Sequence, residues 1–234
     1  MELKQDNKTQ ASIKVIITGA TGMIGKGVLL ECLDNKAITQ VLVINRSTVG
    51  ISHPKLKEIL YPDFSNFDLI KKDLKGYDAV YFCLGISANG LKEAQYRTIT
   101  YDYTINFAKA VLEQNTNLTF IYVSGQGTDS SEKSRMMWAR VKGATENALL
   151  KMPFKQAYMF RPGIIQPMRG IQSRTKWYNT IYKIIKPIWP LFRAVMGNKL
   201  TNTDNIGEAM INAVTKGYHK QHLSNADIND LSRK

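Results

Sequence analysis

Apolar runs alternate along the chain with segments whose apolar residues recur at helical spacing. The runs predict buried strands near residues 13–17, 38–47, 56–64, 77–85, 118–127 and 155–165. The helical spacing predicts helices near 23–33, 96–115, 134–152 and 201–217. Because parallel strands are covered on both faces, they appear in sequence as continuous apolar runs. The pattern therefore predicts an α/β fold of Rossmann type, a doubly wound parallel sheet flanked by helices.

The length of 234 residues suits one domain, and the hydrophobic fraction of 44% suits an ordinary globular core. We expect a single domain over residues 1–234, with its dinucleotide-binding core at 13–165. The strand–helix alternation fails after about Gln166. Residues 166–200 are expected to form a small, basic and aromatic C-terminal cap, and residues 201–218 a closing helix.

Positive charge is concentrated in one part of the chain. The net charge is +13, and residues 133–199 contain 14 Lys and Arg but only one acidic residue, Glu146. Such a field favours an anionic ligand, an acidic lipid surface or nucleic acid, although a solubilising face explains it equally well. Residues 166–199 fit either an interfacial helix or a substrate cap, and Pro187 and Pro190 favour the cap because they break a long helix.

Cysteine and histidine offer little metal chemistry. Cys32 and Cys83 lie in apolar runs and provide neither a disulfide framework nor a zinc spacing, so we expect no metal site and a cytoplasmic protein. We expect His53, His219 and His222 not to ligate metal, and the last two to be solvated in a polar tail. The first twelve residues are polar and do not resemble a signal peptide.

A glycine-rich turn follows the first predicted strand and opens a helix, as a dinucleotide-binding turn requires. Gly19 would permit the tight turn, Gly22 would let the backbone approach a pyrophosphate, and Gly25 would let the helix pack closely on the strand. Free amides and the dipole at the helix start favour the anion.

The end of the second predicted strand indicates which cofactor is bound. An NAD site usually carries an acidic residue there, which holds the ribose hydroxyls. This strand ends in Asn45, Arg46 and Ser47, without an acid. Arg46 could pair with a 2′-phosphate and Ser47 could donate a hydrogen bond to it, so NADP(H) is favoured over NAD.

Five motifs occur in an order that resembles the short-chain dehydrogenase/reductase superfamily, in its atypical or extended branch. They are TGATGMIG at 18–25, CLG at 83–85, YVSGQGTD at 122–129, WARVKGATENALL at 138–150 and FRPGIIQP at 160–167. The V-K-G-x-x-E run that begins at Val141 is similar to the NAD(P)-binding oxidoreductase-like group that includes the Tat-interacting protein TIP30 and its bacterial relatives. The resemblance covers residues 13–217.

The resemblance assigns roles to matching positions. Residues 21–24 should line the pyrophosphate, Arg46 the adenosine ribose, residues 63–64 the adenine, and residues 83–85 the middle of the cofactor. Lys142 should hold the nicotinamide ribose, and residues 162–163 should approach the carboxamide. The positions carried over are Thr21, Gly22, Met23, Ile24, Arg46, Asp63, Phe64, Cys83, Leu84, Gly85, Lys142, Pro162 and Gly163.

The resemblance also implies a catalytic site, in which this sequence departs from the family. Ser124 matches the superfamily serine and Lys142 its lysine, but Trp138 stands where a tyrosine acid is usual. An indole N–H donates a hydrogen bond but does not transfer a proton. Another donor would be Ser124, water, or a tyrosine such as Tyr101 or Tyr103.

Three functions therefore remain open. The first is an NADP-dependent oxidoreductase, or an epimerase-like enzyme, with a non-standard site and an unknown small-molecule substrate. The second is a catalytically weak regulator or sensor that binds the cofactor. The third is a protein that binds a membrane or nucleic acid through residues 166–199. The oligomeric state is not predicted.

Overall fold

A seven-stranded parallel sheet forms the centre of the computed structural model, which describes residues 12–172 and 196–234. Its strand order is β3-β2-β1-β4-β5-β6-β9, and every neighbouring pair is parallel. A separate parallel pair joins β7 to β8. The strands are β1 Ile13–Thr18, β2 Ile38–Asn45, β3 Leu56–Leu60, β4 Ala79–Phe82, β5 Thr119–Val123, β6 Gln156–Phe160, β7 Ile164–Gln166, β8 Leu200–Asn202 and β9 His222–Leu223.

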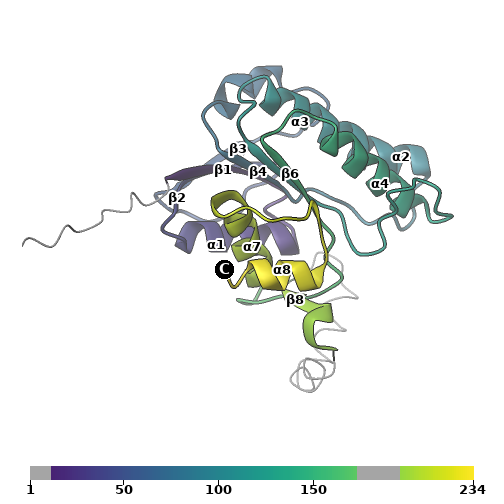
Figure 1. Ribbon diagram of the computed structural model, residues 1–234. Coiled ribbons are helices and arrows are strands. Elements are labelled where there is room, and N and C mark those ends of the chain that lie inside the picture. The colour runs from purple at the N-terminus through teal and green to yellow at the C-terminus, as the bar shows by residue number, and fades with distance from the viewer. Residues whose placement is uncertain (1–11, 173–195) are drawn as a thin grey trace, which may run out of the picture.

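Helices cover both faces of the sheet (Figure 1). One face packs against α1, α7 and α8, and the other against α3, α4 and the 3₁₀ helix η1. The helical elements are α1 Met23–Asp34, η1 Asp68–Leu74, α2 Glu93–Arg97, the π-helical η2 Thr98–Asp102, α3 Tyr103–Leu112, α4 Met137–Leu150, the short η4 Gly197–Lys199, α7 Thr203–Thr215 and α8 Asn225–Leu231. The doubly wound α/β fold predicted from the sequence is confirmed.

The predicted strands and helices are present, with shorter bounds at most ends. The helix predicted over 96–115 is divided by the π-helical turn η2. The polar tail expected after residue 218 instead forms β9 and α8, so His222 lies in the edge strand of the sheet with a partly exposed side chain. Two residues are too few for strand periodicity to be recognised. Ser224 and Asp227 do form a capping box at the start of α8, which is a local signal for a helix.

Residues 173–195 lie outside the described part of the chain, so most of the expected cap, with Trp177, Pro187, Trp189 and Pro190, lies there too. Within the described ranges no helix has the length and apolar character needed to cross a membrane.

Gly143, in the middle of α4, allows this helix to approach the loop that follows β5. A Cβ atom at this position would lie 1.8 Å from the carbonyl oxygen of Asp129. Asp129 is itself fixed, because its carboxylate accepts hydrogen bonds from the backbone amides of residues 131, 133 and 134. The Ser131 hydroxyl also donates a hydrogen bond to this carboxylate, and this bond contributes most to lowering the pKa of Asp129 to about 2. The backbone bonds lower the pKa further. The Asp129 amide also donates a hydrogen bond to the Ala139 carbonyl oxygen of α4 at 3.1 Å, so the loop cannot move away from α4 without losing that bond.

We predict that Gly143→Ala destabilises the protein, although alanine is the better helix former by about 1 kcal/mol. Overpacking against the Asp129 carbonyl should lower the free energy of unfolding by about 1–3 kcal/mol. Urea denaturation measures this as a lower midpoint with an unchanged slope. Ala144→Gly, at the next position, is the control: helix propensity alone predicts opposite signs for the two variants, whereas the structure predicts that both lose stability. A Gly143→Ala protein more stable than the native chain would contradict the close contact.

Candidate functional site

The glycine turn between β1 and α1 is built by close contacts between backbone segments. Gly19 has φ of +70°, and a Cβ there would lie 2.6 Å from the peptide that joins Cys83 to Leu84. A Cβ on Gly25 would lie 2.3 Å from the Gly19 carbonyl oxygen. Gly22 differs, because its φ of −85° is open to any residue and its nearest neighbour would be 3.3 Å away. Gly19 and Gly25 are thus required by packing. Gly22 is less constrained, and the space beside it leaves room for a ligand.

A cleft of about 410 Å³ opens beside this turn, at the carboxyl ends of β1, β2 and β4. Its volume lies within the range of small-molecule and cofactor sites. Nine of the residues predicted to bind the cofactor line it: Gly19, Thr21, Gly22, Arg46, Ser47, Phe64, Cys83, Leu84 and Gly85. The carboxyl edge of a parallel sheet, at the point where the strand order reverses, is where such folds bind ligands.

The end of β2 supplies the polar part of the cleft. Arg46 and Ser47 are exposed on its wall, and in the described ranges neither side chain has a hydrogen-bond or ion-pair partner. No acidic residue belongs to the lining. Asn45 is buried, and its Oδ1 accepts a hydrogen bond from the Ala20 amide at 3.2 Å, while its Nδ2 has no partner. The cleft therefore presents an unpaired guanidinium and a hydroxyl, a set that suits phosphate and ribose oxygens.

Five residues of the cleft wall were not among the predicted cofactor-binding positions: Asn45, Pro62, Ile86, Ile99 and Tyr103. Ile99 lies in the π-helical turn η2, and Tyr103 begins α3 directly after it. The sequence predicted one continuous helix here, so it did not indicate which residues would turn toward the cleft. π-Helical turns occur often at functional sites, and this one borders the cleft.

Seven of the predicted cofactor residues lie outside the lining of this cleft: Met23, Ile24, Gly25, Asp63, Lys142, Pro162 and Gly163. Met23 and Ile24 pack their side chains on the core, although their amides belong to the first turn of α1, where amides have no intrahelical partner. Asp63 is exposed, and hydrogen bonds from Ser65 lower the pKa of its carboxyl group. Pro62 and Phe64, its two neighbours, form the wall instead.

Lys142 and Ser124 meet at the carboxyl end of β5, as the resemblance implied, but they are engaged with other groups. The Lys142 ammonium donates a hydrogen bond to the Ser124 carbonyl oxygen. The Ser124 hydroxyl donates to the Glu146 carboxylate at 2.5 Å, and lies 3.2 Å from the Phe160 carbonyl oxygen. Desolvation lowers the pKa of Lys142 to about 8, against the opposing effect of the Glu146 carboxylate.

Glu146 is the fully buried charge of this region, and the sequence alone did not assign it a role. Its carboxylate forms an ion pair with Arg161, whose Nε lies 3.0 and 3.2 Å from the two oxygens. His222 Nε2 lies 3.4 Å from Oε2 without making a hydrogen bond. Desolvation lowers the pKa of His222, and Glu146 opposes the shift. A buried carboxylate needs such partners. Here they are supplied to Glu146 of α4 by residues at the ends of β5 and β6 and by β9.

Trp138 lies one helical turn before Lys142 on α4 and faces the same loop. Its Cη2 atom would be 3.0 Å from a Cβ on Gly127, three residues after Ser124. The two residues that the resemblance places at the catalytic acid and lysine positions are therefore on the same side of α4. Trp138 packs over the loop and is only partly buried.

The two tyrosines considered as substitute donors lie elsewhere. The Tyr103 ring centroid is 6.3 Å from that of Phe64, on the side of the cleft expected to hold the adenine. The Tyr101 ring is covered by the Arg97 guanidinium, 4.2 Å from its centroid. Neither tyrosine forms a hydrogen bond with Ser124 or Lys142 in the described residues.

No cluster of three or more His, Cys, Asp or Glu side chains within residues 12–172 and 196–234 is arranged to hold a metal ion. Cys32 and Cys83 are both free thiols, and burial raises the pKa of each of them. Cys83 also lines the cleft.

Comparison with known proteins gives a family and several relatives. The model of a family described as NAD(P)H-binding matches residues 19–153, more than half of the chain. The chain is 30% identical over 217 residues to the mitochondrial protein fmp52 of Emericella nidulans, covering 86% of this chain and 87% of that one. It is 26% identical over 179 residues to protein HTATIP2 of Rattus norvegicus, covering 76% and 72% of the two chains.

Solved structures at low sequence identity share the fold. A Gre2–NADPH complex from Candida albicans gives a TM-score of 0.68 at 16% identity, covering 91% of this chain and 77% of the other. A UDP-glucuronic acid 4-epimerase from Bacillus cereus, in complex with NAD, gives 0.66 at 18% identity, covering 91% and 78%.

The comparison also corrects the expectation of a cytoplasmic protein. That expectation depended only on the two cysteines and the polar start. It is contradicted by the relatives, because the fmp52 proteins of several fungi are named as mitochondrial. Two reduced cysteines do not distinguish one reducing compartment from another, so cysteine content was too weak a signal to decide this. The glycine turn, the cleft, the family match and the relatives agree on one identification: the chain belongs to the NAD(P)H-binding family.

Proposed function

We propose that this protein binds NADP(H) in the cleft beside the glycine turn and prefers it to NAD(H). The observation that carries the proposal is the unpaired Arg46 guanidinium beside Ser47, in a cleft wall without an acidic residue. A 2′-phosphate would give this cation a charge-assisted partner, and no carboxylate would repel it. The Gre2 structure, of the same fold, contains NADPH.

We further propose that cofactor binding, rather than rapid turnover, is the principal activity of the native chain. NADPH supplies a hydride when it is bound, and carbonyl reduction then requires a proton at the substrate oxygen. Trp138 does not supply one, because an indole N–H does not titrate usefully. The Ser124 hydroxyl already donates its hydrogen to Glu146, so it is not free to polarise a carbonyl. Lys142 keeps a positioning role without a phenol to acidify.

Arg46→Ala should remove the preference for NADPH over NADH. The loss of one charge-assisted contact at a partly exposed site should cost about 1.5–3 kcal/mol, roughly ten- to a hundredfold in NADPH affinity, while NADH affinity stays near its native value. Isothermal titration calorimetry with both cofactors measures this. Lys36→Ala, which removes an exposed cation outside the cleft lining, should leave both affinities unchanged. Equal affinity of the native chain for the two cofactors would contradict the assignment of Arg46.

Gly22→Val should abolish binding of both cofactors and leave the fold intact. The backbone of Gly22 is extended and admits a side chain, although its Cβ would lie a close 3.3 Å from the Gly19 carbonyl oxygen, and valine would occupy the space beside the turn. Calorimetry gives the affinity, and thermal unfolding monitored by circular dichroism confirms the fold. Gly22→Ala, with a smaller side chain, should show an intermediate affinity. A folded Gly22→Val protein that binds NADPH as the native chain does would show that the ligand lies elsewhere.

Trp138→Tyr should increase NADPH-dependent carbonyl reduction. The phenol would stand one helical turn from Lys142, whose positive charge lowers a phenol pKa, and general acid catalysis is typically worth ~10²–10⁴-fold. The assay follows NADPH oxidation by its absorbance, with a panel of aldehydes and ketones. Trp138→Phe is the matched control, because it removes the indole without adding an acid, and should give no increase.

The result of this experiment distinguishes a cofactor-binding protein from an active reductase. An increase with tyrosine alone supports a cofactor-binding protein whose reductase site lacks its acid. Vigorous turnover by the native chain that neither substitution changes would contradict the proposal of weak catalysis and would require another proton donor.

A further inference from the structure

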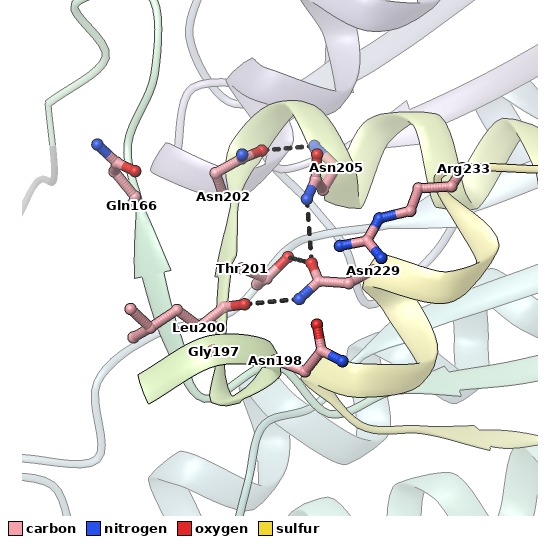
Figure 2. A pocket seen from close by; sticks show the side chains of 9 residues that line it. All are labelled: Gln166, Gly197, Asn198, Leu200, Thr201, Asn202, Asn205, Asn229 and Arg233. Atoms are coloured by element: carbon pink, nitrogen blue, oxygen red, sulfur yellow. Dashed lines mark hydrogen bonds between the residues drawn. The ribbon is translucent and has the colours of Figure 1, made fainter. Parts of the chain in front are cut away.

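A second, smaller pocket lies between the β7–β8 pair and helices α7 and α8, and it shares no lining residue with the dinucleotide cleft. Its volume is about 170 Å³. Figure 2 shows side chains from β7, η4, β8, α7 and α8 around it. Its polar lining consists mainly of five amide side chains and one guanidinium, those of Gln166, Asn198, Asn202, Asn205, Asn229 and Arg233. No acidic side chain belongs to the lining.

The inner wall of this pocket is held in one arrangement by hydrogen bonds. Asn229 Oδ1 accepts from the Thr201 hydroxyl at 2.8 Å and from Asn205 Nδ2 at 3.0 Å. Asn229 Nδ2 donates to the Leu200 carbonyl oxygen at 2.6 Å. Thr201 and Asn229 are buried, and Figure 2 shows these bonds joining β8 to α7 and α8. The wall is therefore formed before any ligand arrives, which reduces the entropic cost of binding.

The remaining polar groups of the pocket have no partner in the described residues. Gln166, Asn198 and Arg233 make no side-chain hydrogen bond or ion pair there, and Asn202 uses only its Oδ1, which accepts from the Asn205 amide at 2.6 Å. In Figure 2 the head groups of Asn198 and Arg233 point toward the same space as that of Asn229. A guanidinium has five donors and no acceptor, so the free groups carry an excess of donors and one positive charge.

We propose that this pocket binds a small organic carboxylate that also carries a hydroxyl group. A carboxylate matches the guanidinium fork of Arg233, and none of the described lining residues is an acid that would compete for it. Side-chain amides donate and accept, so they suit a hydroxyl group beside the carboxylate. The volume is below the range of about 300–1,000 Å³ typical of drug-sized ligands, which restricts the ligand to a small molecule. The site is separate from NADP(H) binding and does not depend on it.

The test uses the full-length, ¹⁵N-labelled protein and two probes of equal shape, lactate and its neutral analogue lactamide. Side-chain amide resonances of Gln166, Asn198, Asn202, Asn205 and Asn229 report directly on the pocket. Lactate should shift them in a saturable way, and lactamide should not. Shifts of equal size with both probes, or none with lactate at millimolar concentration, would overturn the proposal. Tighter binding of inorganic phosphate than of lactate would overturn the assignment to a carboxylate.

Substitutions in and beside the pocket test whether the shifts caused by lactate come from this site. Arg233→Gln should weaken lactate binding at least tenfold, since one charge-assisted interaction is lost. Asn198→Asp should also weaken it, because this exposed residue has no partner to lose and gains a repelling charge. Lys234→Gln is the matched control: it removes the adjacent cation, which lies outside the lining, and should change nothing. Arg46→Ala should leave the lactate response intact. A response that persists in Arg233→Gln, or that disappears in Arg46→Ala, would refute a separate site.

Discussion

The contact between the backbone at Gly19 and the end of β4 determines the geometry of the cofactor cleft. Gly19 lies so close to the peptide that joins Cys83 to Leu84 that only a hydrogen atom fits on its Cα, and Gly25 lies against the Gly19 carbonyl. Three segments, β1, β4 and α1, are thereby fixed relative to one another. The amides at the start of α1 and the loop after β4 then border the same space. A larger residue at Gly19 or Gly25 would separate these segments, so the turn is constrained by packing before any ligand is considered.

A second constraint, the buried Glu146, acts at the carboxyl ends of β5 and β6, outside the lining of the cleft. It connects α4 to β5 through Ser124, to β6 through Arg161, and brings His222 of β9 close by. Removing one partner of a buried ion pair typically costs about 3–5 kcal/mol, because the other charge is left without compensation. The pair therefore keeps the end of the sheet in register. It also takes the serine hydroxyl as a donor, which links the stability of this region to its limited catalytic equipment.

The sequence predicted best those features that depend on local chemistry. The glycine turn was recognisable because strand, turn and helix follow one another within a few residues, and Arg46 because it ends a clearly apolar run. Glu146 and His222 could not be found in this way, because their roles come from contacts between elements far apart in the chain. Asp63 was predicted to line the cleft, but its neighbours Pro62 and Phe64 do so instead. Nothing in the sequence shows which of three consecutive loop residues face the cleft. The π-helical turn at 98–102 was hidden within a continuous helical pattern.

The glycine turn and the region around Trp138 are thus under different constraints, so the second can change without the first. The turn depends on glycines whose substitution would disturb β1, β4 and α1 together. The position of Trp138 is less constrained, because the residue is partly exposed and packs on the loop at Gly127 rather than between backbone segments. Exchange of a proton-donating phenol for an indole would change the chemistry of the site and leave the fold, the cleft and the unpaired Arg46 as they are. The residues of the glycine turn are therefore more constrained by packing than the residue at position 138.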